Sequence, residues 1–245
     1  MIQDVNVRAA FGAACAVYGE GPDAAKDTEA KEWRSRVDKK MQATPHKVEE
    51  QDRTVLSDGH FRLERMTLQT ETFAGEMSRP LVREVLRSGR SVGVLLYDAD
   101  ADRFVLTEQF RIGAYLNELE SPWLLECAAG MVDGGETPLE AARREVEEET
   151  GLPVRQIEQV GAYLTSPGIT DELITIFVAW VDASRAGGVH GEEDEGEDIR
   201  TRLMTRDEAL RAADEGAAIN IVTQLALLWF ARHGEALRSR WLAMQ

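Results

Sequence analysis

The sequence predicts a mixed α/β sandwich with an N-terminal extension. From about residue 60, short apolar or alternating segments recur between turn residues, which is typical of strands. A few other segments have apolar residues at helical spacing. Because the strands are not each followed by a helix, the order favours a mixed sheet over a doubly wound one. The 245 residues, 43% of them hydrophobic, suffice for one sizeable domain with an appendage or for two small domains.

Residues 1–50 form an extension to which the sequence assigns no function. The apolar run 7–21 is similar in length to a signal peptide, but Asp4 precedes it, so we expect a short packing helix instead. The polar segment 21–41 is expected to be helical, and residues 43–52 are expected to form a linker. The rest of the chain is divided into N-terminal strands over 51–88 and a main domain over 89–245.

Seven strands are predicted after the extension. The segment 61–73 alternates between apolar and polar side chains. The segments 91–98 and 103–110 are apolar, rich in β-formers, and separated by a turn of aspartate and alanine. The remaining strands are predicted at 123–132, 160–166, 173–181 and 197–205.

One helix is predicted between the fourth and fifth strands, over 138–150. Thr137 and Glu140 form a capping box, and Pro138 occupies the first helical position. Gly151 ends the helix.

Two more helices are predicted towards the C-terminus. The segment 206–216 has helical composition, and 220–244 has apolar residues at helical spacing over its whole length. No internal repeat interrupts this order of elements.

Composition and charge exclude several classes of protein. The net charge of −16 argues against a nucleic-acid-binding surface, because phosphate contacts need clustered lysine and arginine. Cys15 and Cys127 have neither metal-ligand spacing nor a disulfide framework, so we expect a reducing, cytoplasmic setting. The chain has no run of 18 apolar residues, and we expect no contact with a membrane.

Carboxylates crowd the C-terminal half of the helix at 138–150, where the helix dipole disfavours negative charge. Glu145, Glu148 and Glu149 have the spacing i, i+3 and i+4, which places them within about 60° on one face. Glu147 faces away from them, and we expect the carboxylate of Glu149 to be exposed to solvent. Like charges this close repel each other unless a cation lies among them, so the cluster indicates either a divalent metal site or a solvated acidic face.

The cluster lies within a longer motif. Gly130 is followed by five residues and Glu136, then by seven residues and the run Arg-Glu-Val-Glu-Glu-Glu-Thr-Gly-Leu at 144–152. Every fixed position of this motif resembles the Nudix box. The resemblance implies the Nudix α/β/α sandwich and hydrolysis of a nucleoside diphosphate linked to another group.

A larger part of the chain, about residues 57–240, resembles the bacterial ADP-ribose pyrophosphatase branch of that family. The similarity lies in the segment 121–136 that leads into the box, in Ser166-Pro167-Gly168, in the acidic loop at 187–200, and in the C-terminal helix. It implies hydrolysis of ADP-ribose or another ADP-sugar to AMP and ribose 5-phosphate.

The resemblance also implies roles for individual residues. It implies roughly two or three Mg²⁺ (or Mn²⁺) ions in each site. Their ligands would be the backbone carbonyl of Ala129 and the side chains of Glu145, Glu148, Glu149 and Glu197. If Glu148 is not a ligand, it would orient the attacking water. Glu195 would take a proton from that water, or another carboxylate of the acidic loop would do so in its place. Positions that shape the box rather than react would be Gly130, Glu136, Arg144 and Gly151.

Substrate contacts are implied outside the box. The residues concerned are His60, Arg83, Glu84, Arg111, Ser166, Pro167 and Gly168. Arg111 would contact phosphate, and His60 stands where the branch stacks an aromatic ring on adenine. Arg83 and Glu84 would reach the adenine end across a homodimer interface formed with the strands at 51–88. Two alternatives stay open: a Nudix hydrolase for another nucleotide sugar such as GDP-mannose, and a nucleotide-sugar sensor without enzymatic activity.

Overall fold

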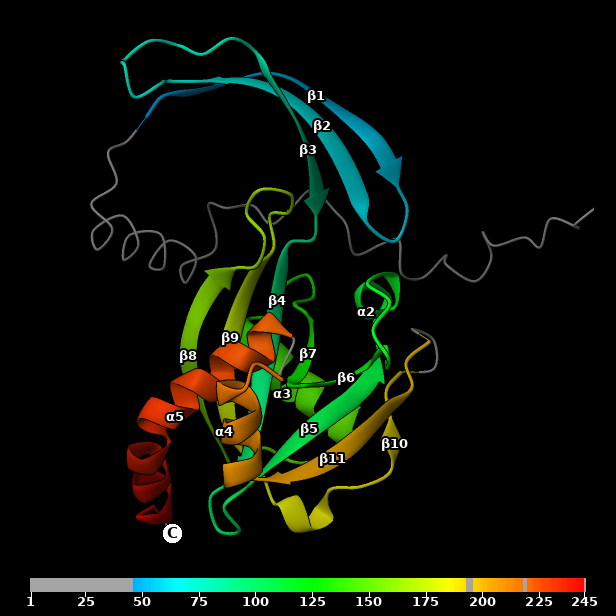
Figure 1. Cartoon of the computed structure of the whole chain (residues 1–245), viewed down its shortest axis with the longest axis vertical. Helices are drawn as coiled ribbons and strands as arrows, with labels where there is room; N and C mark the ends of the chain where they lie inside the picture. The colour runs from blue at the N-terminus through cyan, green and yellow to red at the C-terminus, as the bar shows by residue number, and fades with distance from the viewer. Residues whose placement is uncertain (1–45, 193–195, 218–219, 245) are drawn as a thin grey trace, which may run out of the picture. The chain divides into compact units, whose positions relative to one another are not determined.

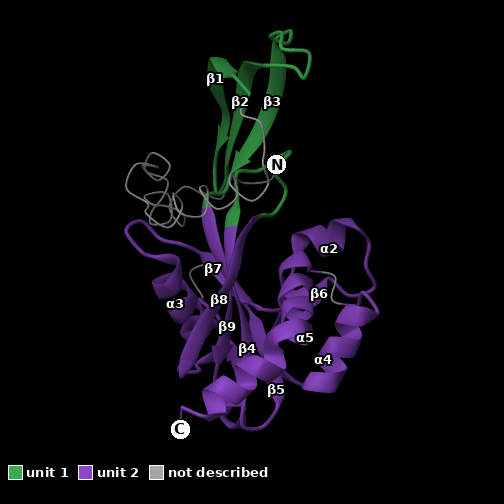
Figure 2. Ribbon diagram, turned by 90° about the vertical axis from the view of Figure 1, so that its left-hand side faces the viewer, with its two compact units in different colours: residues 1–89, 164–173 green, residues 90–163, 174–245 purple. Residues whose placement is uncertain are grey.

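The computed structural model describes residues 46–192, 196–217 and 220–244. The chain forms two compact units, which Figure 2 colours separately. Unit 1 comprises residues up to Gly89 together with 164–173, and unit 2 comprises 90–163 and 174–245. The helices expected at 7–21 and 21–41 lie outside the described residues.

Unit 1 contains a three-stranded antiparallel sheet in the order β1-β2-β3, drawn in blue to cyan-green in Figure 1. Its strands are β1 (Val48–Asp58), β2 (Arg62–Thr70) and β3 (Leu81–Arg87). The linker expected at 43–52 is wrong from Val48 onwards, because β1 begins there. Side chains along β1 are exposed throughout, so this strand is held mainly by its backbone pairing with β2.

Unit 2 is built on an eight-stranded sheet. Six strands follow the order β10-β11-β5-β4-β9-β8, while β6 pairs with β5 and β7 pairs with β4. The strands are β4 (Arg90–Asp98), β5 (Arg103–Phe110), β6 (Trp123–Glu126), β7 (Ala128–Met131), β8 (Gln156–Leu164), β9 (Leu173–Trp180), β10 (Val189–His190) and β11 (Ile199–Thr205). The predicted strands at 91–98, 103–110, 173–181 and 197–205 are therefore confirmed within one to two residues.

Helices cover both faces of this sheet. Its helices are α2 (Ile112–Leu116), α3 (Pro138–Thr150), α4 (Arg206–Asp214) and α5 (Ile221–Leu242), with a short 3-10 turn η2 (Ala183–Arg185). Along β4, Val94 and Leu96 pack with Val146 of α3 in one apolar cluster. Leu95 of the same strand packs with Phe230 of α5 in the other cluster. Because successive side chains of a strand point to opposite faces, one sheet supports two cores.

This layering confirms the α/β/α sandwich. β4 is buried along nearly its whole length, which explains why its sequence is continuously apolar rather than alternating. The predicted helices at 138–150, 206–216 and 220–244 correspond to α3, α4 and α5. Strands β1 and β3 lie largely within the region 51–88 that was expected to hold strands but were not predicted individually, and strand β10 and helix α2 were not predicted. Among the described residues, no helix has the length and apolar composition that a membrane span requires.

Candidate functional site

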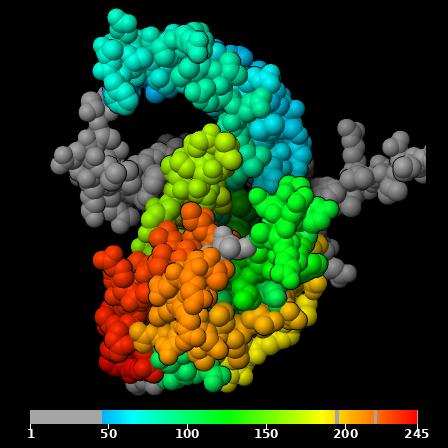
Figure 3. Space-filling model, in the orientation of Figure 1, coloured from blue at the N-terminus to red at the C-terminus, as the bar shows by residue number. Residues whose placement is uncertain are grey.

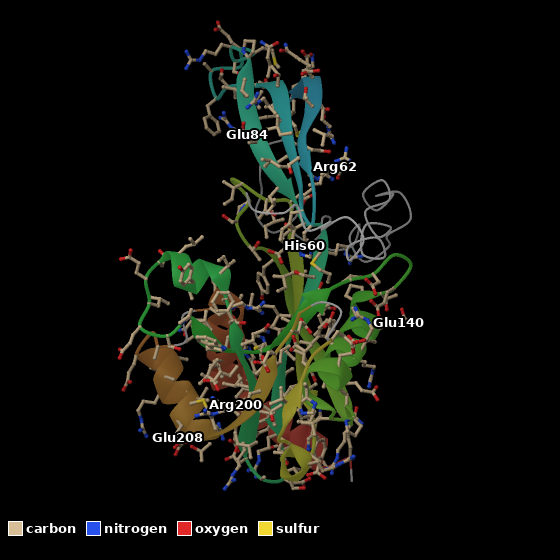
Figure 4. All side chains as sticks on the ribbon, turned by 90° about the vertical axis from the view of Figure 1, so that its right-hand side faces the viewer. His60, Arg62, Glu84, Glu140, Arg200 and Glu208 are labelled. Atoms are coloured by element: carbon tan, nitrogen blue, oxygen red, sulfur yellow. The ribbon has the colours of Figure 1, made fainter. Side chains whose placement is uncertain are left out.

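The box helix α3 begins and ends as its sequence predicts. The hydroxyl of Thr137 accepts a hydrogen bond from the backbone N–H of Glu140, and the Glu140 carboxylate accepts one from the N–H of Thr137 at 2.8 Å. Figure 4 labels Glu140 at this end of the helix. Gly151 caps the other end with φ of 65°, a left-handed conformation that glycine adopts without steric strain.

The carboxylates of α3 differ sharply in exposure. Glu147 is exposed, as predicted, and Glu148 is partly exposed. Glu145 is 9% exposed and Glu149 is 0% exposed. The expectation that Glu149 faces solvent is therefore wrong, because the helical face bearing Glu145 and Glu149 is turned towards the sheet, beside β7.

The close approach of α3 to β7 depends on a glycine. A β-carbon at Gly130 would lie 2.0 Å from Oε1 of Glu145, which is far inside contact distance. Next to it, the backbone N–H of Ala129 donates a hydrogen bond of 3.1 Å to Oε2 of Glu149. Gly130 thus makes room for the Glu145 carboxylate, and Ala129 holds that of Glu149 against the strand.

Arg144 lies among the acidic side chains. Its guanidinium forms two hydrogen bonds of 3.1 Å with Glu136, which is the predicted pair. Nη1 donates to Glu145 at 2.9 Å and to Glu148 at 2.8 Å, and Nη2 donates to the carbonyl of Met131. Partial burial acts to lower the pKa of Arg144, but the bonds to these glutamates outweigh it and raise the pKa. Part of the like charge on α3 is therefore balanced by an arginine of the same helix.

The two buried carboxylates, Glu145 and Glu149, have raised pKa values. Burial is the main cause that raises the pKa of Glu149 to about 9, and the neighbouring charges of Glu145 and Glu197 add to it. Burial likewise raises the pKa of Glu145 to about 7, although Arg144 acts in the opposite direction. The residues around these carboxylates thus leave negative charge that a cation would stabilise.

A divalent cation fits this donor set chemically. Oε1 of Glu149 is buried and, in the described part of the chain, has no hydrogen-bond partner, which is rare for a buried polar atom. Carboxylate and carbonyl oxygens are the ligands that Mg²⁺ prefers. Among the described residues, no three acidic, histidine or cysteine side chains converge on one point. In this conformation, the Arg144 guanidinium donates hydrogen bonds to Glu145 and Glu148.

The acidic loop between β10 and β11 lies close to the box helix. The N–H of Gly191 donates to the carbonyl of Glu148 at 3.3 Å. Glu192 and Glu197 are linked by two hydrogen bonds of 3.2 Å across the loop. The charge of Glu197 contributes to the raised pKa of Glu145 and of Glu149, so this loop belongs to the same electrostatic site. Glu195, the predicted base, lies outside the described residues.

Two residues that the sequence reasoning missed connect to Arg111. Nε of Arg111 donates to Oε2 of Glu126 at 2.6 Å, and Nδ2 of Asn220 donates to Oε1 of the same carboxylate at 2.6 Å. Glu126 is 2% exposed. The charge on Arg111 also acts to lower the pKa of Glu149, which associates this network with the box carboxylates. The signal in the sequence was a single glutamate within the apolar segment 123–132.

The other predicted substrate contacts lie in unit 1. Ser166, Pro167 and Gly168 are exposed in a turn in which the carbonyl of Ser166 accepts hydrogen bonds from two following backbone N–H groups. His60 is exposed at the turn between β1 and β2, with its ring 4.5 Å from that of Phe61.

Arg83 and Glu84 are consecutive residues of β3, which is an edge strand of the three-stranded sheet. Their side chains therefore project to opposite faces, and the Glu84 carboxylate accepts a hydrogen bond of 2.6 Å from Arg65. A ligand that contacts both residues has to lie along the β3 edge. Figure 4 labels Glu84 and His60 in this unit.

Most of this chain is similar in sequence to known proteins. The NUDIX domain model matches residues 87–225. The chain is 41% identical to the ADP-ribose pyrophosphatase of Escherichia coli strain K12 over 189 residues, which is 77% of this chain and 90% of that protein. It is 35% identical to the ADP-ribose pyrophosphatase of Haemophilus influenzae over 85% of this chain and 97% of that one. It is also 37% identical to the GDP-mannose pyrophosphatase of Cronobacter sakazakii, over 71% and 89%.

Proposed function

The chain belongs to the Nudix hydrolase family, and from that premise we propose that it hydrolyses the pyrophosphate bond of ADP-ribose to AMP and ribose 5-phosphate. The single observation on which this proposal rests is the pair of buried carboxylates: Glu145 lies against Gly130, Glu149 accepts a hydrogen bond from the N–H of Ala129, and the pKa values of both are raised. An arrangement that leaves buried negative charge uncompensated suits a site that binds a cation. It would be an unfavourable choice for a purely structural helix.

The choice of ADP-ribose over another nucleotide sugar is supported by similarity. The relatives named ADP-ribose pyrophosphatase match with 35–41% identity over 77–85% of the chain. A relative named GDP-mannose pyrophosphatase matches with 37% identity over 71%. GDP-mannose is therefore the second candidate substrate.

The divalent metal ion is proposed to be Mg²⁺, with Mn²⁺ as a substitute. Such an ion, when bound, activates water and neutralises charge on the phosphates. The proposed ligands of about two or three such ions in each site are the carbonyl of Ala129 and the side chains of Glu145, Glu148, Glu149 and Glu197. The hydrogen bond from the Ala129 N–H to Glu149 supports this set, because it orients one carboxylate oxygen and leaves the other without a partner.

The remaining chemistry is assigned to two side chains. Arg111 is proposed to bind a phosphate of the substrate through its two terminal nitrogens, since its Nε is already bonded to Glu126. Glu195 is proposed to accept the proton of the attacking water. Its neighbours Glu193 and Asp194 are the alternatives within the same loop.

We further propose a homodimer in which each active site uses residues of both subunits. Arg83, Glu84 and His60 would contact the adenine end, and Ser166, Pro167 and Gly168 would also contact the substrate. The strand β1 is exposed along its whole length, including Val48 and Val55, which supports such an interface. Cys127 is a buried free thiol, which suits the proposed cytoplasmic location, and the acidic composition supports a protein that does not bind nucleic acid.

Subunit exchange tests the shared site. An Arg83→Ala protein and a Glu145→Gln protein should each be inactive, and mixing them should restore activity to a fraction of the sites. If light scattering shows a monomer at assay concentration, or if verified exchange restores nothing, the shared site is wrong and the box assignment is unaffected.

A substrate panel tests the reaction itself. ADP-ribose, ADP-glucose, GDP-mannose and UDP-glucose are incubated with Mg²⁺, and products are identified by chromatography. We expect AMP and ribose 5-phosphate from ADP-ribose at the highest kcat/KM. Faster hydrolysis of GDP-mannose would move the assignment to the second candidate, and binding without turnover of any sugar would support the sensor.

A further inference from the structure

We infer that Asn220 is a positioning residue for phosphate binding: its amide fixes the buried carboxylate of Glu126, and Glu126 in turn fixes the guanidinium of Arg111. The inference rests on the proposed function through one point only, the role of Arg111 as a phosphate contact. All three residues belong to unit 2. The chain separates them by 15 and 94 positions, so only the fold brings them together.

The orientation of the Asn220 side chain is determined by its hydrogen bonds. Asn220 is the N-cap of α5, and its Oδ1 accepts from the N–H groups of Val222 at 2.9 Å and Thr223 at 3.2 Å. Both partners are donors, so the atom that faces them must be the amide oxygen. Nδ2 is then directed at Glu126, to which it donates at 2.6 Å.

A second contact holds the start of α5 in place. The hydroxyl of Thr223 accepts a hydrogen bond of 2.9 Å from the N–H of Cys127, the residue that follows Glu126. Both Cys127 and Thr223 are 1% exposed. Further along α5, Leu227 and Phe230 are buried in the core. The cap residue therefore sits on a helix end that cannot move relative to β6 without breaking buried contacts.

At the other end of the network, Arg111 is also anchored through its backbone. Its N–H donates to the carbonyl of Pro122 at 2.9 Å, next to the pairing of Phe110 with Trp123 between β5 and β6. With Nε bonded to Glu126, the two terminal nitrogens have no hydrogen bond to any described residue. The guanidinium is thus oriented with its terminal nitrogens available, which is the geometry needed for a bidentate phosphate contact. Figure 3 shows the adjoining α2 segment, in bright green, exposed on the same face as α4 and α5.

The identity of residue 220 follows from these two tasks. Aspartate and serine cap helices about as well as asparagine. Aspartate would place a second carboxylate against Glu126, and serine is too short to donate to it. Only asparagine offers an acceptor for the helix end and a donor for the carboxylate from one side chain.

Three variants separate helix capping from positioning. Asn220→Asp and Asn220→Ser keep a cap and remove the donor to Glu126. Thr205→Ala serves as the matched control, because it removes the N-cap of α4. The Thr205 hydroxyl accepts a hydrogen bond from the N–H of Glu208 and contacts neither Glu126 nor Arg111. The probe is the α,β-methylene analogue of ADP, which cannot be cleaved at that bond, and binding is measured by calorimetry with Mg²⁺.

We expect Asn220→Asp to weaken binding of the probe about 10-fold or more and Asn220→Ser about 3- to 10-fold, because each loosens a charge-assisted contact of Arg111. Thr205→Ala should lower the midpoint of thermal unfolding and leave affinity unchanged. In an Arg111→Ala background, the substitutions at Asn220 should change affinity less than about 2-fold, since they act only through that arginine. KM for ADP-ribose should rise in parallel with the dissociation constant.

Three results would overturn the inference. The first is an Asn220→Ser protein that binds the probe as tightly as the wild type. The second is an equal loss of affinity in the presence and absence of Arg111, which would show a merely structural role. The third is a wild-type protein that binds no diphosphate. A wild type that binds the diphosphate but cleaves no ADP-ribose would instead contradict the proposed function and leave the inference in place.

Discussion

Glu64 of unit 1 and Glu149 of unit 2 are both buried glutamates, yet their pKa values are shifted in opposite directions. Burial acts to raise the pKa of Glu64, but Arg87, Arg53 and Arg62 surround its carboxylate and the net shift is downward. Burial raises the pKa of Glu149 to about 9, and the like charge of Glu145 adds to the shift. Arginines of unit 1 therefore balance the negative charge of Glu64, whereas the residues of unit 2 do not balance the negative charge of Glu149.

The difference matches the way each unit is held together. Unit 1 has a thin sheet whose first strand is exposed throughout, so its ion pairs contribute to cohesion. Arg87 pairs with both Glu64 and Asp171, and Asp171 also accepts hydrogen bonds from the N–H groups of Ser88 and Gly89. Unit 2 has two apolar cores and can tolerate an unfavourable buried charge. An uncompensated carboxylate in a well-packed unit therefore points to function rather than stability.

The largest expected effect is on catalysis in unit 2. Glu149→Gln should lower the rate of ADP-ribose hydrolysis by about 10³-fold or more at saturating substrate, because the amide is a much weaker ligand for the divalent ion. The rate is measured with Mg²⁺ at pH 8. Glu147→Gln, two residues away on the exposed side of the same helix, is the control and should keep its activity. A Glu149→Gln protein with near wild-type turnover would contradict the metal-site reading of the box.

The corresponding change in unit 1 should affect stability instead. Glu64→Gln leaves three arginines around a neutral group and should lower the free energy of unfolding by about 2 kcal/mol. The pair is only partly buried on the arginine side, which limits the loss. Urea denaturation measures it. Glu50→Gln removes an exposed partner of the same Arg53 and should lower the free energy of unfolding much less than Glu64→Gln does. Equal losses in the two variants would show that burial does not distinguish these carboxylates.

The sequence predicted the fold of unit 2 better than that of unit 1, for a physical reason. Strands such as β4 are apolar because they are buried between two layers, so composition alone marks them. Every side chain of β1 is exposed, so the strand has no apolar periodicity. Its pairing with β2 depends on backbone hydrogen bonds, which the sequence of side chains does not indicate.

The site divides in the same way. Helical spacing places Glu145, Glu148 and Glu149 on one face, and the sequence sufficed to predict this. It could not predict that this face is buried, because burial depends on how closely α3 approaches Gly130. Nor could it join Arg111 to Asn220, since that contact is made through Glu126 by elements far apart in the chain.

The pH dependence of stability should separate the two glutamates. In chelator, folded protein retains protons on Glu145 and Glu149 that the unfolded chain releases near its ordinary carboxyl pKa of about 4.5. The free energy of unfolding should therefore fall by several kcal/mol as the pH rises from 5 to 9. The lowered pKa of Glu64 acts with the opposite sign, and its contribution is lost as pH falls below about 4.5. Glu149→Gln should flatten the decline above pH 5, and Glu64→Gln should not. Thermal melts across this range measure both.

The smallest expected effect, and the most specific, is the response of stability to Mg²⁺. Ligand binding to the folded state at tenfold excess over its dissociation constant adds about 1.4 kcal/mol to the free energy of unfolding. Because the ion requires ionised carboxylates and the pKa of Glu149 is raised to about 9, binding must displace a proton. At a fixed Mg²⁺ concentration the added stability should therefore be small at pH 6 and grow towards pH 9, opposite to the trend in chelator. Glu149→Gln should lose most of this response and Glu64→Gln should retain it. A response that is equal in the wild type and both variants, or that is independent of pH, would mean that Mg²⁺ binds elsewhere. The unbalanced charge of Glu149 would then have another cause.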